Sequence, residues 1–282
     1  MTAKVGRVDH PVIAVKDLKQ TKEQFQKLGF IVPPIGQHQE WGTENLCIMF
    51  PNDYLEIRGV NDPNKFLAGV DDFLKNGQGF YSVAFNSKSA EESYAEAVKS
   101  GIEIKLPKHL NRKLVLEDKV LDLHFKTVML DSKYFPGLTH ANLCEHLTFD
   151  TLRQPEWLDH PNGVVSFGRL TGVVKDFDAA ESIYSKLLGA ENVHREQDRI
   201  TLTFGIGADI ELIDEEEAAR RGDNHEGRGE DYLASATLLV KDLAVAKSTL
   251  EQNGIRFQET KTNLIRIDPR DACGSVIYFS QE

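Results

Sequence analysis

The sequence predicts an α+β protein built from four βαβββ modules, which pair into two domains with curled mixed sheets. The main observation behind this prediction is a repeated tripeptide. Val-Lys-Asp occurs at residues 15–17, 174–176 and 240–242. Each copy ends an apolar run and leads to a glycine, at Gly29, Gly189 and Gly254. A fourth, degenerate copy runs from Tyr81 to Gly101. An internal repeat of this kind defines the architecture before any single residue is considered.

Each copy has the composition of a strand followed by a helix and a second strand. The run that ends in the tripeptide contains β-branched residues, which favour a strand. The Asp that closes the tripeptide can cap a helix, because its carboxylate accepts hydrogen bonds from the first amides. The glycine suits a left-handed C-cap, and the hydrophobic residue after it restarts a strand.

Further strand candidates follow each helix. In chain order they are residues 45–50 and 54–60, 122–130 and 142–149, 199–204 and 209–213, and 264–267 and 275–279. In residues 54–60, Leu55 and Ile57 alternate with Glu56 and Arg58, as in a strand with two different faces. A module of about 50 to 70 residues is too small to bury a good core alone, so the modules should pair.

The position of a polar, proline-containing segment sets the domain boundaries. Residues 151–163 include Pro155, Pro161 and Gly163, and they separate the first two copies from the last two. We therefore expect a first domain at residues 1–150, a linker at 151–163 and a second, degenerate domain at 164–282. The length of 282 residues and the hydrophobic content of 40% suit two domains with real cores.

Charge and composition exclude some partners. The formal net charge of −11 argues against a nucleic-acid-binding protein, which needs a concentrated basic face. No apolar stretch approaches the ~20 residues of a membrane span, and residues 1–9 lack the apolar segment of a signal peptide. We expect a cytoplasmic protein with a small-molecule ligand or substrate, and a homodimer is compatible with the sequence. The three scattered cysteines are expected to be reduced core thiols: Cys47, Cys144 and Cys273.

The candidate chemistry lies in the first half. His10 is in the first predicted strand of the first module, and Glu56 is in its last strand. If the sheet curls, side chains from these two strands can meet at its concave centre. An imidazole and a carboxylate are then candidate ligands for a divalent metal such as Mn, Fe, Ni or Zn. The alternatives are a hydrogen-bonded core histidine and an outward, solvated glutamate.

Four segments together resemble the glyoxalase-like branch of the vicinal oxygen chelate superfamily. They are Asp9-His10 at the start of an apolar strand, the turn at residues 38–45, Tyr54-Leu55-Glu56, and His160-Pro161-Asn162-Gly163. The resemblance covers roughly residues 6–163. It implies paired βαβββ modules around a cup-shaped cavity, with metal ligands on the first and last strands.

The resemblance assigns roles to individual positions. His10 and Glu56 match the ligand positions of the first module, whereas the matching first-strand position of the second module falls near Phe80, which cannot ligate. The last strand of that module ends in Glu145 and His146, and alternation allows only one of them to face inward. Either Glu145 or His146 would therefore join His10 and Glu56. The resemblance implies His10, Glu56 and His146 as metal ligands, and Glu56 or Glu145 as the residue that transfers a proton. The turn supplies expected substrate-binding residues: His38, Trp41, Gly42, Thr43 and Asn45.

The second half resembles the superfamily only through its repeats. Its equivalents of His10 and Glu56 are Arg169 and Glu211, which we expect to form an internal ion pair in a metal-free domain.

We therefore expect a metal-dependent enzyme of the lyase or isomerase type, in which a Lewis acid stabilises an enolate or oxyanion of a small oxygenated metabolite. Two alternatives belong to other classes. One is a metal-free binding or resistance protein, and the other is a ring-cleaving iron dioxygenase that uses two histidines and one carboxylate.

Overall fold

The computed structural model describes residues 5–225 and 227–282. In this part of the chain, no helix is long and apolar enough to cross a membrane.

The first two modules comprise β1 (Val8–Ala14), α1 (Leu18–Lys27), β2 (Gly36–His38), β3 (Thr43–Met49) and β4 (Tyr54–Val60), then β5 (Gly79–Asn86), α3 (Ala90–Lys99), β6 (Lys108–Val115), β7 (Val120–Leu130) and β8 (Ala141–His146). The short helix α2 (Val70–Lys75) joins them, and α4 (Phe149–Leu152) follows.

The last two modules have the same order. They comprise β9 (Val164–Val173), α5 (Phe177–Leu188), β10 (Val193–Arg195), β11 (Arg199–Leu202) and β12 (Asp209–Ile213), then β13 (Tyr232–Val240), α7 (Leu243–Gln252), β14 (Phe257–Glu259), β15 (Ile265–Ile267) and β16 (Val276–Gln281). Helix α6 (Glu215–Arg221) connects them, and single 3-10 turns occur at η1 (Ser132–Tyr134), η2 (Pro155–Trp157), η3 (Ala190–Asn192) and η4 (Pro269–Asp271). The predicted four βαβββ modules are confirmed.

The helix signals found in the sequence act as expected. The side chains of Asp17, Asp176 and Asp242 each accept a hydrogen bond from an amide in the first turn of their helix, and Ser89 does so for α3. The glycine after each of these helices has a positive φ angle. One predicted strand was too long: residues 142–149 do not continue as a strand beyond His146, because α4 begins at Phe149.

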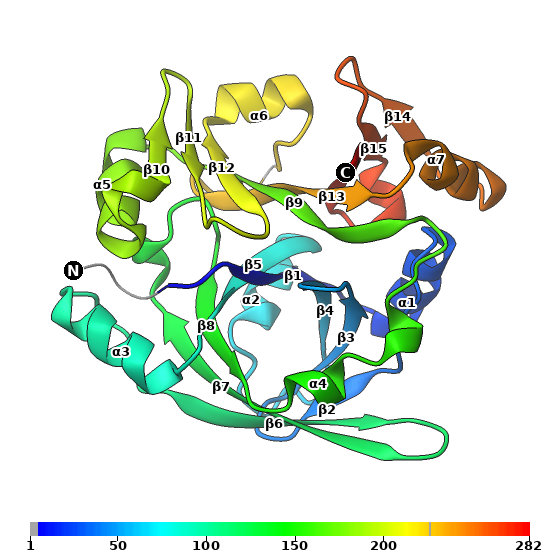
Figure 1. Ribbon diagram of the computed structural model, residues 1–282, viewed down its shortest axis with the longest axis horizontal. Helices are drawn as coiled ribbons and strands as arrows, with labels where there is room; N and C mark the ends of the chain where they lie inside the picture. The colour runs from blue at the N-terminus through cyan, green and yellow to red at the C-terminus, as the bar shows by residue number, and fades with distance from the viewer. Residues whose placement is uncertain (1–4, 226) are drawn as a thin grey trace.

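The strands of the first half form a closed barrel in the order β1-β4-β3-β2-β6-β7-β8-β5. The first and last strands of each module are parallel neighbours, so Val12 on β1 pairs with Glu56 on β4, and Ala84 on β5 pairs with Asn142 on β8. The short strand β2 closes the barrel by pairing with β6. Strands β1 and β4 therefore lie side by side in the barrel wall (Figure 1).

The strands of the second half form one curled sheet in the order β10-β11-β12-β9-β13-β16-β15-β14. It lies across the barrel on the side of β1 and β5, and α6 lies over its opposite face (Figure 1). The barrel and this sheet share one hydrophobic core. Phe50 of the barrel packs against Phe167 of β9 with ring centroids 5.6 Å apart.

The segment between the two sheets is anchored to the barrel. His160 is buried; its Nδ1 accepts a hydrogen bond from the Ile31 amide, and its Nε2 lies 2.9 Å from the Met49 carbonyl oxygen. Since Nδ1 accepts, Nε2 carries the proton and donates. Trp157 packs into a small cluster with barrel residues.

Candidate functional site

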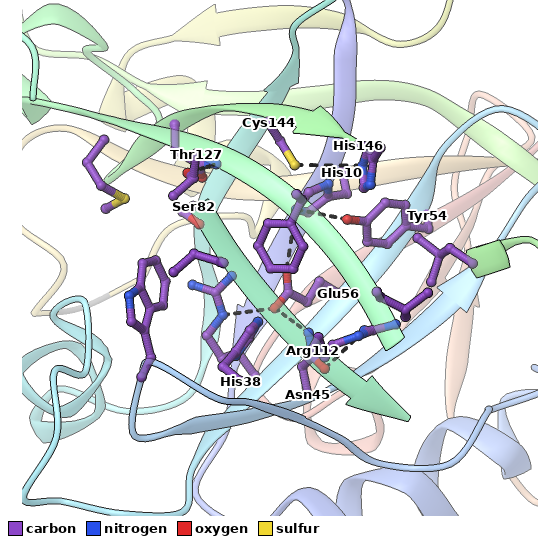
Figure 2. Close-up of a pocket in the computed structure, with 18 of the residues that line it drawn as sticks. His10, His38, Asn45, Tyr54, Glu56, Ser82, Arg112, Thr127, Cys144 and His146 are labelled. Atoms are coloured by element: carbon purple, nitrogen blue, oxygen red, sulfur yellow. Dashed lines mark hydrogen bonds and ion pairs between the residues drawn. The ribbon is translucent and has the colours of Figure 1, made fainter. Parts of the chain in front are cut away.

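The barrel interior contains a narrow, mainly enclosed cavity. Its polar walls include His10 on β1, Glu56 on β4, Arg112 on β6 and His146 on β8 (Figure 2). Arg58 on β4 also lines it. Its free volume is about 50 Å³, which is room for a few water molecules. A ligand in this space must therefore be small.

His10 and Glu56 face each other across the first module. The two atoms His10 Nε2 and Glu56 Oε2 are 3.3 Å apart, and both side chains are buried. Tyr54 stacks on the His10 ring at a centroid distance of 4.1 Å, and its hydroxyl lies 3.4 Å from Nε2. The sequence-based expectation that these two residues share an interior is met by this geometry.

Asp9 connects the two cavity histidines. Its Oδ2 atom accepts hydrogen bonds from His10 Nδ1 at 2.7 Å and from His146 Nε2 at 2.8 Å. Burial opposes the charge on Asp9, but the bonds from His10 and His146 outweigh it and hold the pKa of Asp9 well below its usual range. Burial likewise works to lower the pKa of His10, whereas the carboxylates of Asp9 and Glu56 raise it. Asp9 is therefore an ionised acceptor that fixes both rings.

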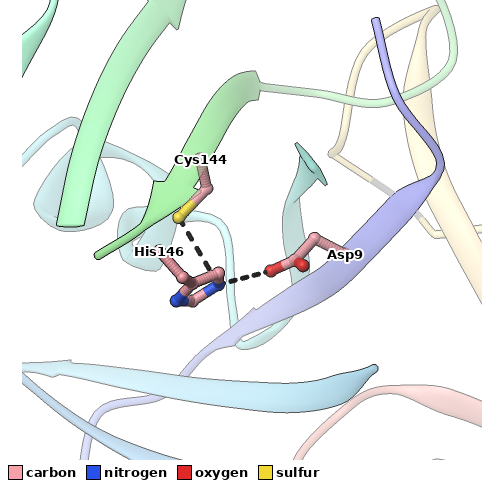
Figure 3. A group of neighbouring side chains, drawn as sticks. All are labelled: Asp9, Cys144 and His146. Carbon is pink, nitrogen blue, oxygen red and sulfur yellow. Dashed lines mark hydrogen bonds and ion pairs between the residues drawn. The ribbon is translucent and has the colours of Figure 1, made fainter. Parts of the chain in front are cut away.

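A second group of ligand-type side chains lies at the same place. Among the described residues, Asp9, Cys144 and His146 bring one ligand-type atom each to within 4.8 Å of one another (Figure 3). The Cys144 sulfur is 3.7 Å from His146 Nε2. His10, Glu56 and His146 line one cavity, but they are not gathered this closely, and the ring centroids of His10 and His146 are 6.4 Å apart.

The Glu56 carboxylate is held by one neutral donor, Asn45, and one cationic donor, Arg58. Its Oε1 atom accepts from Asn45 Nδ2 and from Arg58 Nε, both at 2.9 Å. Burial opposes its charge, but Arg58 and His10 hold the pKa of Glu56 well below its usual range. The lowered pKa means that the carboxylate is ionised. The two hydrogen bonds to Oε1 orient it, with Oε2 facing His10.

The expected substrate-binding residues separate into two groups. His38, Trp41 and Asn45 line the cavity. Gly42 and Thr43 do not, and their roles are local. A side chain at Gly42 would collide with the Asp62 carbonyl, because a Cβ atom there would lie 2.0 Å from that oxygen. Thr43 Oγ1 lies 2.9 Å from His38 Nδ1 and so orients the ring.

In the second module two expectations were wrong: the role of Glu145 and the first-strand position near Phe80. Glu145 points away from the cavity, and its carboxylate accepts from the Ala90 amide at the start of α3 at 2.8 Å. Alternation along β8 places Cys144 on a different face from Glu145, and His146 enters the cavity at the strand end. Phe80 belongs to the hydrophobic core between the sheets.

The module register identifies the true equivalents of the first-module pair. Glu56 pairs with Val12, two residues after His10, and Asn142 pairs with Ala84, two residues after Ser82. Ser82 and Asn142 are therefore the equivalents of His10 and Glu56. Both line the cavity, and neither is charged.

Several site residues were not found from the sequence. Asp9 was noted only as part of a resemblance, and Arg112 lies on β6, a strand that the sequence-based prediction missed. Arg58 was placed in its strand by alternation but received no role. Its spacing of two residues from Glu56 was the available signal that both share one face.

In the second half, the positions equivalent to His10 and Glu56 are held by Arg169 and Glu211. Arg169 and Glu211 form the expected ion pair, with Arg169 Nη1 3.4 Å from Glu211 Oε1. Glu211 is also bound by Arg199 at 3.4 Å and by Arg221 of α6 at 2.5 Å. Three guanidinium groups thus surround this buried carboxylate, and α6 is anchored across the sheet at that point.

Paired βαβββ modules around a cup with a histidine on the first strand and a glutamate on the last define a vicinal oxygen chelate fold. The chain belongs to the glyoxalase-like domain family of that superfamily, whose family model matches residues 8–188. A comparison with curated proteins gives no significant match.

Solved structures share the fold across the whole chain. A hypothetical protein from Staphylococcus aureus superposes with a TM-score of 0.69 at 12% identity, covering 98% of this chain and 99% of that one. A triple mutant of 4-hydroxymandelate synthase from Streptomyces coelicolor gives 0.64 at 12% identity, with 98% and 92% covered. A xylose isomerase-like TIM barrel/4-hydroxyphenylpyruvate dioxygenase fusion protein gives 0.59 at 12% identity, and this chain, covered to 100%, matches 49% of it. At this identity the likeness concerns the fold alone.

Proposed function

We propose that the chain is a metal-dependent enzyme of the lyase or isomerase type, acting in the barrel cavity on a small oxygenated metabolite. The observation that supports this most is the His10–Glu56 pair. Its two facing atoms are 3.3 Å apart in a buried, narrow cavity. Two ligands of one small divalent ion, each about 2.0–2.2 Å from it, are separated by a similar distance.

The donor set fits a divalent ion. His10 offers Nε2 while its Nδ1 is bonded to Asp9, and a carboxylate on the second ring nitrogen is the usual support for a metal-binding histidine. Glu56 offers Oε2 while Oε1 is bonded to Asn45 and Arg58. His146 would supply the third ligand after turning from Asp9. Such an ion supplies Lewis-acid stabilisation of negative charge on a substrate oxygen.

The residues around the cavity orient the His10 and Glu56 side chains and keep bulk water out. Asp9 fixes the His10 ring, and Asn45 and Arg58 fix the Glu56 carboxylate. Glu56 Oε2 carries no hydrogen bond from Asn45 or Arg58, so when this carboxylate leaves the ion, Oε2 would be the atom that accepts a substrate proton and returns it. The enclosed volume keeps bulk water away from this atom.

A metal-free binding protein is the second candidate, and one observation favours it. Arg58 and Arg112 both reach the cavity, and Arg58 already neutralises Glu56 through a 2.9 Å ion pair. Two guanidinium groups close to the carboxylate weaken its attraction for a cation. The two candidates differ in whether a metal stabilises the folded protein.

Thermal unfolding of chelator-treated protein with added Mn, Fe, Ni or Zn tests the proposal. We expect the melting temperature to rise with the ion in the wild type, because a ligand that binds the folded state stabilises it, and the rise to vanish in Glu56→Gln. Glu44→Gln is the matched control, since Glu44 is on β3 next to Asn45 and so faces outside the barrel. No metal-dependent shift at millimolar ion and no metal by elemental analysis would support the binding protein instead. Bound iron together with oxygen uptake would indicate a dioxygenase.

A further inference from the structure

Two buried arginines line the cavity beside Glu56. Arg58 is 9% exposed and Arg112 is 5% exposed. Arg58 follows Glu56 by two residues on β4, and Arg112 is on β6, paired with His38 across the seam that closes the barrel. Gly36 leaves room for Arg112, because a Cβ atom at Gly36 would lie 3.1 Å from Arg112 Cδ. The fold thus directs two cations into one small interior.

The charge of Arg112 has no carboxylate partner among the described residues. Its Nη1 atom donates to Asn45 Oδ1 at 3.0 Å and to Cys47 Sγ at 2.7 Å. Burial raises the pKa of Cys47 to about 11, so the thiol is neutral at neutral pH. Glu56 is already paired with Arg58. A buried guanidinium without an anion is unfavourable for folding alone, so its presence needs another reason.

Free donors of both arginines face the cavity. Arg58 donates from Nε to Glu56, and Arg112 donates from Nη1 only, as far as the described residues show. The remaining guanidinium nitrogens of Arg58 and Arg112 make no hydrogen bond to the described residues and are not fully buried, so they are accessible from the cavity that both side chains line. A guanidinium with free parallel N–H groups matches the planar, two-oxygen shape of a carboxylate.

Glu56, which Arg58 neutralises, is the carboxylate nearest to the two arginines. The groups on the side of His38 carry no negative charge. Burial and the nearby Arg58 lower the pKa of His38 to about 3, so this ring is neutral. Trp41 and Phe125 supply apolar walls on the same side of the cavity.

We propose that Arg112 and Arg58 form a carboxylate-binding subsite, so that the cavity takes a small organic acid whose oxygenated carbon chain points toward His10 and Glu56. This inference rests on the proposed function, since it names the substrate class of the same cavity. The free volume of about 50 Å³ restricts the acid to a few carbon atoms.

Binding to metal-free protein tests the subsite separately from the metal. Calorimetry and thermal shift in excess chelator would compare pyruvate and lactate with the uncharged analogues pyruvamide and lactamide. We expect the acids to bind and the amides to bind at least tenfold more weakly. Arg112→Met should weaken binding of the acids by tenfold or more, as for the loss of a charge-assisted hydrogen bond. Lys113→Gln, the exposed neighbour on β6, should leave it unchanged.

A further readout separates binding from a structural role. Because Arg112 is buried without a counter-ion, the ligand-free Arg112→Met variant should melt at or above the wild-type temperature. Arg112→Lys, which keeps the charge but loses the planar fork, should retain part of the affinity and serves if the Met variant does not fold.

Several results would overturn the subsite. They are equal binding of acids and amides, equal losses in the Arg112 and Lys113 variants, and tighter binding of inorganic phosphate than of the acids. Binding of acids only when metal is added would also contradict it while leaving the proposed metal-dependent function intact.

Discussion

Asp9 and His10 are adjacent in sequence, yet the Asp9 carboxylate accepts a 2.7 Å hydrogen bond from the His10 ring. Neighbouring residues of a regular strand point to opposite faces. The pairing of β1 with β5 shifts register between Val8 and His10, so a bulge at this point turns the two side chains toward each other. The same carboxylate reaches His146 on β8, and it therefore couples the two modules of the barrel.

Removing the charge of Asp9 should weaken both folding and metal binding. Asp9→Asn leaves two buried histidines without their anion, and we expect the free energy of unfolding to fall by about 3 kcal/mol. Loss of the support on His10 should lower metal affinity by about 10- to 100-fold. Urea unfolding and metal titration measure the two effects. Asp118→Asn, in the exposed β6–β7 turn, is the control, and equal behaviour of the two variants would refute the role of Asp9.

Replacing Glu145 should lower the free energy of unfolding but leave metal binding unchanged. Its carboxylate binds the Ala90 amide at the first turn of α3, outside the cavity. Glu145→Ala is expected to cost about 1 kcal/mol of unfolding free energy, as for a lost helix-end acceptor. The metal-dependent rise in melting temperature should persist in this variant. Loss of this metal-dependent rise would indicate that Glu145 takes part in metal binding.

Asp53 should make stability depend on pH. This carboxyl is 1% exposed, and burial raises its pKa to about 7 from the usual 3.8. Between these values the folded state holds a proton that the unfolded chain has lost, so stability present at low pH is lost as the pH rises through about 7. The free energy of unfolding of Asp53→Asn, relative to wild type, should therefore increase by up to about 4 kcal/mol between pH 4 and pH 8.

Urea unfolding at several pH values measures this difference. Asp159→Asn removes a carboxylate whose side chain is 92% exposed, and it is the matched control. A pH dependence of Asp53→Asn that follows the wild type would contradict the assignment.

The barrel and the second sheet should unfold together, because they share one core. At their contact a Cβ atom on Gly172 would lie 2.3 Å from the Gly137 carbonyl oxygen. We expect Gly172→Ala to lower the free energy of unfolding by about 3 kcal/mol through overpacking. Gly59→Ala is the control, since its nearest contact would be 3.6 Å. Calorimetry showing two separate transitions in the wild type would contradict the common core.

The sequence predicted the module order because repeats, helix caps and glycines act locally. It also brought His10 and Glu56 together, since both are fixed by alternation on neighbouring strands. It could not place Asp9, because the bulge in β1 depends on pairing with β5 and leaves no mark in the residues themselves. Arg112 was missed for a related reason: β6 is polar and exposed on its outer face, so its composition does not indicate a strand.

Glu145 and His146 show a second limit. Alternation allows only one of two neighbours to face inward, but the choice depends on where the strand starts and ends. The predicted strand ran to residue 149, whereas β8 ends at His146, where α4 approaches.

Anomalous scattering from crystals grown with Mn, Ni or Zn tests the central claim most directly. The account predicts an anomalous peak at the metal edge between His10 Nε2 and Glu56 Oε2, with His146 as the third protein ligand, and no such peak in Glu56→Gln crystals. Absence of a peak in the wild-type cavity, or a peak that appears only at Asp9, Cys144 and His146 without Glu56, would contradict it.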